Sequence, residues 1–369
     1  MIYLDNGATS FYKPPSVVRA VVRAMQTCAN PGRGGYGAAM EAARTVFLCR
    51  ELAGDLFGCE GERVVFTMNC THSLNIAIRS LVKPGERVLI SGFEHNAVTR
   101  PLHALGAKVT VAGRKLFDPA DTLEQFERGL KNGQDAAVFT HVSNVFGYIL
   151  PVAEMAALCR QYGVPFVVDA AQSAGSLKVD IGAWGADFVA MPGHKGLLGP
   201  QGTGLLLCGR IPDPLLFGGT GSESRRQEMP DFLPDRLEAG TMNVPGIAGL
   251  YAGLSYIRDM GTDAVFAREH NQLLRCVNGL GRMGFRVFAG ENQAGTVSFL
   301  PGMDCEKAAE ILASRGIALR AGLHCAPLAH ESAGTLETGT VRASFGINAR
   351  DSDTDVFLRA CAKLRGKLT

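Results

Sequence analysis

The sequence predicts an α/β fold, with a large domain built on a mostly parallel sheet and a smaller α+β domain. Short apolar, β-branched runs alternate with longer amphipathic ones between residues 64 and 208. Several of the short runs are continuously apolar, which is typical of strands buried on both faces of a parallel sheet. After about residue 250 the strand-like runs become fewer and less uniformly apolar, which indicates the second domain.

The large domain is predicted to contain seven strands separated by helices. The expected strands are Val64–Thr67, Arg87–Ile90, Lys108–Val111, Ala136–Thr140, Phe166–Val168, Phe188–Ala190 and Gly204–Leu207. Between them, Ser73–Val82 and Val152–Tyr162 place their apolar residues on one face at helical spacing. In such a fold, ligands are expected at the carboxyl ends of the strands.

The smaller domain is predicted from a different order of elements. Two helical patterns over 246–282 come first, followed by short strands near 285–288 and 295–299, a helix near 304–315, strands near 317–320 and 340–344, and a last helix from about 352. We place the large domain at residues 13–252, and the smaller domain at residues 1–12 and 253–369.

Composition and charge exclude several classes of function. The net charge of +2 gives no reason to expect a nucleic-acid or membrane-surface partner. The ten cysteines are scattered without a CxxC pair, so neither a metal site nor a secreted disulfide framework is expected. Asp5 and Asn6 interrupt the N-terminus where a signal peptide needs an apolar run, and the uncharged stretch Ala136–Ala153 contains polar residues and Pro151. A cytoplasmic protein with reduced thiols is therefore predicted.

The segments PFVVDAAQSAG and ADFVAMPGHKGLLGPQGTG are the most informative part of the chain. Asp169 ends one apolar strand, and His194 and Lys195 lie in a glycine-flanked loop after the next strand. This pair suits pyridoxal phosphate, because a lysine can form the Schiff base and a carboxylate can keep the ring nitrogen protonated. The residues alone also allow a solvated lysine and a helix-capping aspartate.

The segments YLDNGATS, DAAQS and GHKGLLGPQGTG resemble those of the cysteine desulfurases, within the class V aminotransferase family of pyridoxal phosphate enzymes. The resemblance extends over nearly the whole chain, with its motifs in the family order. It implies the aspartate-aminotransferase type of fold (fold type I), pyridoxal phosphate as the cofactor, and a homodimer.

The resemblance assigns roles around the cofactor ring. Lys195 matches the lysine that forms the Schiff base and carries the substrate α-proton, and Asp169 matches the partner of the ring nitrogen. Gln172 resembles the residue that donates to the ring oxygen, and Asn144, in HVSNVFG, lies near that oxygen or the substrate carboxylate. His95, in FEHNAV, corresponds to the histidine that stacks on the ring and acts as acid or base. A lone histidine is more often structural, so this last role depends on the motif.

The segment FTMNCTHSLN follows a strand and opens a helix, so its free N–H groups and the helix dipole favour an anion. The resemblance gives the phosphate the Thr71 hydroxyl, the Cys70 amide and a bond from His194. Thr241, in EAGTMNVPG, resembles the threonine that reaches the phosphate of the neighbouring subunit. Pro192 stands where many members have a phosphate-binding serine, so somewhat weaker cofactor retention is expected.

The segment RAGLHCAPLAH bears on the choice of reaction, because it places Cys325 in a short loop. It resembles the short-loop group of cysteine desulfurases, which includes selenocysteine lyases. A thiolate there would attack the substrate sulfur and leave alanine and an enzyme persulfide. Arg342, in TVRASFGIN, matches the arginine that grips the substrate α-carboxylate, or is a strand-end arginine in a surface ion pair. Arg320 is a second candidate anion contact, and His324 either stabilises the thiolate or braces the loop.

The leading prediction is a cysteine desulfurase that converts L-cysteine to L-alanine and passes the persulfide sulfur to an acceptor protein. A selenocysteine lyase, a cysteine-sulfinate lyase or a class V aminotransferase on the same scaffold stays open. A non-catalytic partner protein that binds pyridoxal phosphate is the alternative of another class. The presence of Lys195, Asp169, Cys325 and Arg342 argues against it.

Overall fold

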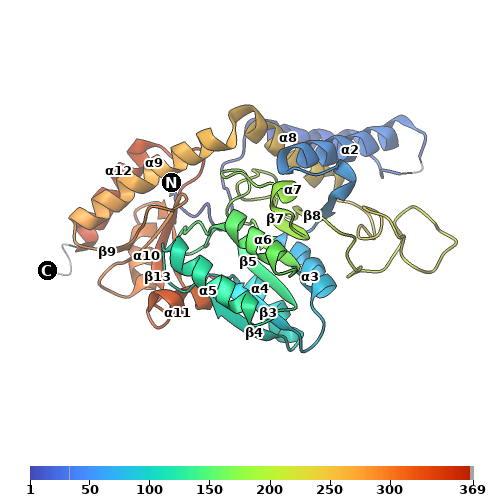
Figure 1. Ribbon diagram of the computed structural model, residues 1–369. Coiled ribbons are helices and arrows are strands. Elements are labelled where there is room, and N and C mark those ends of the chain that lie inside the picture. The colour runs from blue at the N-terminus through green and yellow to red at the C-terminus, as the bar shows by residue number, and fades with distance from the viewer. Residues whose placement is uncertain (33, 366–369) are drawn as a thin grey trace.

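A seven-stranded sheet lies at the centre of the larger part of the molecule (Figure 1). In this computed structural model, which describes residues 1–32 and 34–365, the strand order is β2-β8-β7-β6-β5-β3-β4. The strands are β2 (Val64–Thr67), β3 (Arg87–Ser91), β4 (Lys108–Ala112), β5 (Ala136–Thr140), β6 (Phe166–Asp169), β7 (Phe188–Pro192) and β8 (Gly204–Cys208). Only β8 runs antiparallel to its neighbours, so the predicted mostly parallel sheet is confirmed.

All seven predicted strands are present, and five of them extend one or two residues beyond the predicted end. Burial on both faces explains the apolar runs of the strands other than β4, an edge strand that is mostly exposed. In β3, for example, Val88 and Ile90 pack into one hydrophobic core and Leu89 packs into the other. Strands of this kind need apolar residues at every position, because alternate side chains point to opposite faces.

Helices cover both faces of the sheet (Figure 1). They are α1 (Pro15–Thr27), α2 (Gly37–Phe57), α3 (Cys70–Leu81), α4 (Asn96–Ala104), α5 (Pro119–Lys131), α6 (Val152–Gln161) and the short α7 (Ile181–Trp184), with a 3₁₀ turn at Gly61–Arg63. Helix α3 begins three residues before the predicted start at Ser73. The reason is a cap: Asn69 Oδ1 accepts a hydrogen bond from the backbone N–H of His72 at 2.9 Å.

The second part of the chain contains a four-stranded antiparallel sheet in the order β12-β13-β10-β9. Its elements are β9 (Arg286–Phe288), β10 (Thr296–Leu300), β12 (Arg320–Gly322) and β13 (Thr340–Ser344), with α10 (Cys305–Ala313), α11 (Pro327–Ala333) and α12 (Asp351–Arg365). The single strand predicted near 317–320 is wrong. Residues Ile317–Ala318 form β11, which pairs in parallel with the N-terminal β1 (Ile2–Tyr3), and β12 pairs with β13 instead. The domain limits at residues 12 and 252 stay a prediction.

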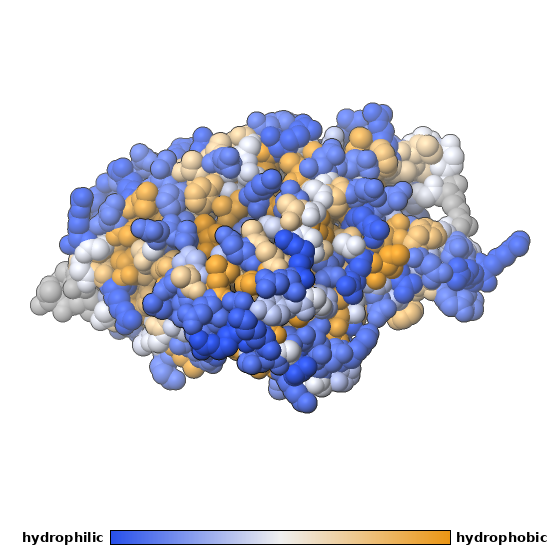
Figure 2. Space-filling model, in the orientation of Figure 1, coloured by the Kyte–Doolittle hydropathy of each residue, from blue (hydrophilic) through white to orange (hydrophobic). Residues whose placement is uncertain are grey.

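Helices α8 (Val244–Met260) and α9 (Thr262–Arg282) run along one side of the molecule, from α2 to the four-stranded sheet (Figure 1). Between β8 and α8, residues 209–243 project from the body without helix or strand. Figure 2 shows apolar surface at the root of this segment and polar surface at its tip. Among the described residues, no helix is both long and apolar enough to cross a membrane.

Candidate active site

The carboxyl ends of five strands surround one cavity of about 110 Å³. Segments that follow β2, β3, β5, β6 and β7 all contribute to its wall. The structure therefore brings together eight of the predicted cofactor residues, namely Cys70, Thr71, His95, Asn144, Asp169, Gln172, His194 and Lys195. Pro192, the last residue of β7, also lines the cavity and offers no hydroxyl there.

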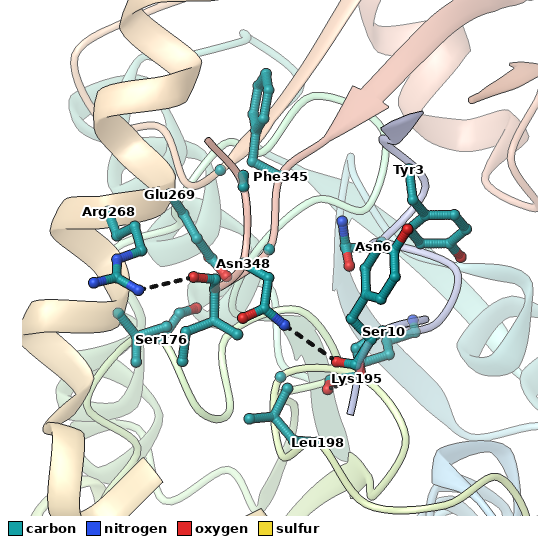
Figure 3. Close-up of a pocket in the computed structure, with 18 of the residues that line it drawn as sticks. Tyr3, Asn6, Ser10, Ser176, Lys195, Leu198, Arg268, Glu269, Phe345 and Asn348 are labelled. Atoms are coloured by element: carbon teal, nitrogen blue, oxygen red, sulfur yellow. Dashed lines mark hydrogen bonds between the residues drawn. The ribbon is translucent and has the colours of Figure 1, made fainter. Parts of the chain in front are cut away.

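A second cavity, of about 840 Å³, meets the first at Lys195 and Gln172. Figure 3 shows Asn6 and Ser10 of the N-terminal segment on one side of it, and Glu269 of α9 on the other. Lys195 therefore lines both cavities and lies where they meet.

Lys195 lies in a tight loop after β7. A Cβ on the next residue, Gly196, would collide with the carbonyl of Ala174, so only glycine allows the loop to pass this close. Burial lowers the pKa of Lys195, while the Asp169 carboxylate opposes that shift and Arg342 adds to it. A lowered pKa increases the share of neutral amine, which is the nucleophilic form.

Asp169 is the last residue of β6, and only 3% of its surface is exposed. Its Oδ1 accepts hydrogen bonds from the Ala171 N–H at 2.8 Å and from the Cys70 thiol at 3.5 Å. Burial raises the pKa of Asp169, and the Ala171 bond opposes the shift. Because both bonds fall on Oδ1, Oδ2 is left for a hydrogen-bond donor of a ligand.

The Cys70 thiol makes a contact that was not predicted from the sequence, from which only the backbone amide of this residue was expected at the phosphate. The side chain is buried against Asp169, and burial raises the pKa of the thiol well above its usual range. The Cys70 amide opens α3, where the first N–H groups of a helix have no intrahelical partner.

His95 caps helix α4, and its Nδ1 accepts the Ala97 N–H at 3.0 Å. Burial, followed by the charge of Lys195, lowers the pKa of His95 to about 4. The ring is therefore neutral near pH 7, and its proton lies on Nε2 because Nδ1 is an acceptor.

Arg342 lies inside strand β13 with 2% of its surface exposed, so the alternative of a surface ion pair is wrong. Its Nη2 pairs with Asp5 Oδ1 at 2.7 Å, and its Nη1 donates to the Asn144 carbonyl at 2.9 Å. Nε is buried without a partner among the described residues. Two of the five N–H donors of this guanidinium are thus engaged, and the rest are available to an anion.

The loop between β12 and α11 presents Cys325, the one exposed thiol among the ten cysteines. His324 beside it is buried, and its Nε2 lies 3.1 Å from the Thr340 carbonyl. Burial, with the charge of Arg342, lowers the pKa of His324 to about 2. A neutral ring cannot stabilise a thiolate by charge, so the bracing role predicted as one alternative is the one this geometry favours. Arg320 is exposed in β12.

Two further predicted contacts stay predictions. Thr241 is exposed in the projecting segment and lines neither cavity of its own chain, and its predicted contact is with the neighbouring subunit. Gln172 does line both, but its Nε2 donates to the Gly7 carbonyl at 3.0 Å.

Glu94, which the sequence analysis did not single out, is a fully buried carboxyl beside His95. Its Oε1 accepts hydrogen bonds from the Ser91 hydroxyl and from the Thr140 N–H, and so joins the ends of β3 and β5. Burial raises the pKa of Glu94 to about 8, because the hydrogen bonds to Oε1 only partly offset the lost solvation.

The raised pKa of Glu94 makes the stability of the protein depend on pH. Between about pH 4.5 and about pH 8 the native state keeps this proton while the unfolded state loses it. The contribution of Glu94 to the free energy of unfolding is therefore complete below about pH 4.5 and falls by about 1.4 kcal/mol per pH unit up to about pH 8. Glu94→Gln should remove that part of the slope, as measured by urea unfolding between about pH 5 and about pH 8. Glu124→Gln, at an exposed ion pair with Arg128, should keep it. Equal slopes for Glu94→Gln and the wild type would contradict the prediction.

Comparison with known proteins decides the family. The sequence profile of the class-V aminotransferases matches residues 2–357. The chain belongs to this family.

Several relatives of this class-V aminotransferase are named as known or probable cysteine desulfurases. A probable cysteine desulfurase of Pyrococcus abyssi is 32% identical, covering 99% of this chain and 94% of the relative. A cysteine desulfurase of Haloferax volcanii is 31% identical, covering 95% and 86%. Among solved structures, the apo cysteine desulfurase of Thermococcus onnurineus matches with a TM-score of 0.91 at 32% identity, covering 99% of this chain and 95% of that one. The cysteine desulfurase CsdA of Escherichia coli matches with a TM-score of 0.87 at 26% identity, covering 100% and 95%. The fold is therefore that of fold type I pyridoxal phosphate enzymes.

Class-V aminotransferases use pyridoxal phosphate, and the residues of the smaller cavity fit that group. The N-terminus of α3 offers free N–H groups to a phosphate, and Asp169 offers Oδ2 to a ring nitrogen. Asn144 Oδ1 is buried without a partner among the described residues, so it is suited to a polar ligand. Lys195 lies on the same wall with its pKa lowered.

Proposed function

We propose that this class-V aminotransferase is a cysteine desulfurase, which releases L-alanine from L-cysteine and holds the sulfur as a persulfide on Cys325. The observation that carries the proposal is the placement of this thiol. Cys325 is exposed, and its carbonyl accepts the backbone N–H of Asn96 at 2.8 Å, one residue beyond His95 of the cofactor cavity. The backbone that carries this thiol is thus anchored beside the candidate cofactor site, which supports a role of Cys325 in sulfur transfer.

The cofactor would be held by groups from the strand ends. Cys70 and Thr71 would bind the phosphate at the start of α3, Asp169 would pair with the ring nitrogen, and His95 would lie against the ring. When bound, pyridoxal phosphate withdraws electrons from the substrate α-carbon and so makes loss of its proton and cleavage of the β-carbon–sulfur bond possible.

The remaining side chains bind the substrate and move protons. Arg342 would bind the α-carboxylate through its free N–H donors, and its planar fork favours a bidentate contact. Lys195, with its lowered pKa, would accept the α-proton at Nζ and return a proton later. His95 would supply or accept a proton at Nε2, because Nδ1 is occupied.

In the sulfur step, the Cys325 thiolate attacks the sulfur atom of the substrate. The new bond is sulfur–sulfur, and the bond that breaks joins the substrate β-carbon to sulfur. The β-carbon takes up a proton to become the methyl group of alanine. One cysteine and one enzyme thiol thus give one alanine and one persulfide, with no external oxidant or reductant.

The test is incubation of the purified protein with L-cysteine, with alanine and sulfide measured in the presence and absence of a reductant. Alanine should form in both cases, and free sulfide should appear mainly with the reductant, which cleaves the persulfide. Pyruvate and ammonia in place of alanine would indicate a β-elimination lyase, and a keto acid with a newly aminated cofactor would indicate an aminotransferase.

We also infer that the protein forms a homodimer, that a second protein accepts the sulfur, and that both act in the cytoplasm. Helices α1 and α2 expose apolar side chains at helical spacing, and the projecting segment exposes more at its root (Figure 2). These residues are Val18, Val22, Met25, Met40 and Phe47 on the helices, and Leu216, Phe217 and Phe232 on the segment. Exposed apolar side chains on these elements suit contact with a second copy of the chain. Ten unpaired cysteines suit a reducing compartment.

Thr241→Ala tests the dimer, because Thr241 lies on the projecting segment away from its own cavity. If it binds the phosphate in the partner subunit, its loss should weaken cofactor retention by about 1.5–3 kcal/mol, the contribution of one charge-assisted hydrogen bond. Dialysis followed by absorbance measures the cofactor that remains. Thr220→Ala, in the same segment, is the matched control and should retain it. A monomer in sedimentation that keeps its full cofactor would contradict the dimer.

A further inference from the structure

The loop that carries Cys325 is held at two consecutive carbonyls. The His324 carbonyl accepts Asn144 Nδ2 at 2.8 Å, and the Cys325 carbonyl accepts the Asn96 N–H at 2.8 Å. Asn96 and Asn144 follow β3 and β5 of the seven-stranded sheet, whereas the loop follows β12 of the other sheet. The thiol is thus connected to the candidate cofactor site by hydrogen bonds between the two sheets.

The backbone of this loop needs such support. His324 and Cys325 both have a positive φ, 49° and 57°, in the left-handed region that side chains with a Cβ seldom adopt. Two such residues in a row persist only where neighbouring groups hold them. Of the two bonds to these carbonyls, the one from Asn144 is made by a side chain, so a substitution can remove it without altering the backbone donors.

Asn144 makes two hydrogen bonds and leaves one buried polar atom free. Its Nδ2 holds the loop, its own carbonyl accepts Arg342 Nη1, and its Oδ1 is buried without a partner among the described residues. The residue also lines the smaller cavity. An amide has two donor hydrogens and two acceptor sites, so Asn144 can bind a polar ligand in the cavity while it holds His324.

We propose that Asn144 is a positioning residue for Cys325, which couples the conformation of the thiol-bearing loop to occupancy of the cofactor cavity. The proposal rests on the proposed function, since it takes the cavity as the cofactor site. A ligand that binds the free atoms of the Asn144 amide fixes the orientation of that amide. It thereby strengthens the hydrogen bond from Asn144 Nδ2 to the His324 carbonyl. Coupling of this kind is reciprocal, so an ordered loop also favours the bound ligand.

Amide hydrogen exchange of the loop tests this without turnover. The reporter is the Ala326 N–H, which donates to the Leu323 carbonyl at 2.9 Å and so closes the turn around the thiol. In the holoenzyme, Asn144→Ala and Asn144→Asp should each speed exchange at Ala326 by about tenfold, the effect of one lost hydrogen bond. Amides of β13 should stay protected, which shows that the variants are folded.

Ser298→Ala is the matched control. Its hydroxyl donates to the Val145 carbonyl at 2.7 Å, so it also joins this segment to the other sheet. It makes no direct hydrogen bond to the Cys325 loop, and reaches it through Thr340, whose hydroxyl it accepts at 3.1 Å and whose carbonyl lies 3.1 Å from His324 Nε2. It should leave exchange at Ala326 unchanged. If Ser298→Ala speeds exchange as much as the Asn144 variants do, general loosening explains the effect and the proposal fails.

The coupling is measured on the wild type with the cofactor bound and after its removal. Exchange at Ala326, and alkylation of the Cys325 thiol by iodoacetamide, should both slow when pyridoxal phosphate is added back. Identical rates in the two forms overturn the coupling, and wild-type exchange in both Asn144 variants overturns the positioning role. Neither readout needs sulfur transfer, so a failure to make alanine from cysteine would count against the proposed function and not against this role.

Discussion

Lys195→Ala is expected to lose the covalent link to pyridoxal phosphate and at least about a thousandfold of the activity, because no other group at the junction of the two cavities can both bond the cofactor and carry the α-proton. The purified wild type should be yellow. Borohydride reduction followed by peptide mapping should place the label on the peptide that contains Lys195.

A matched control separates this effect from the general loss of a lysine. Lys178 is an exposed lysine between β6 and β7, and it forms an ion pair with Asp180. Lys178→Ala should keep the label, the colour and the activity. A label on any lysine other than Lys195 would show that the Schiff-base assignment is wrong.

Cys325→Ala should bind the cofactor as the wild type does, yet lose sulfur transfer by roughly a hundredfold or more, because the nucleophile is gone. Alanine release from L-cysteine is the measurement, together with mass detection of a persulfide on the wild-type Cys325 peptide. Turnover of selenocysteine should survive in part, since selenium leaves more readily without a nucleophile. Cys28→Ala, at a half-buried cysteine outside both cavities, should behave as the wild type.

If Cys325→Ala makes alanine from cysteine at the wild-type rate, Cys325 is not the nucleophile. The reaction would then belong to a lyase or an aminotransferase on the same fold. Unchanged cofactor binding in the same sample makes this result independent of the Lys195 prediction.

The sheet and much of the candidate site could be predicted because their signals are local. A strand buried on both faces needs an unbroken apolar run; Asp169 ends one such run, and Lys195 lies in the loop that follows another. The predicted start of α3 is three residues too late, although Asn69, a favoured capping residue, stands just before the observed start at Cys70. That cap was a signal within the sequence that could have corrected the boundary.

The remaining contacts depend on tertiary structure. Asp5 pairs with Arg342 across 337 positions, and nothing local to either residue indicates the pair. In the sequence, Glu94 cannot be told from an exposed loop carboxylate, because its burial depends on the tertiary structure. The strand predicted near 317–320 is divided because its two halves find different partners, β1 and β13, which only the assembled sheets reveal.

The hydrogen bond between Cys70 and Asp169 has a consequence for side reactions. A cavity that processes a labile sulfur atom contains a second thiol, and a thiolate there would compete with Cys325 and trap sulfur beside the cofactor. Burial, together with the adjacent carboxylate, keeps the Cys70 proton in place, so this thiol is a poor nucleophile. The same carboxylate that would activate the cofactor would thus keep the thiol inside the cavity unreactive, and would leave the sulfur to Cys325, the exposed thiol among the ten cysteines.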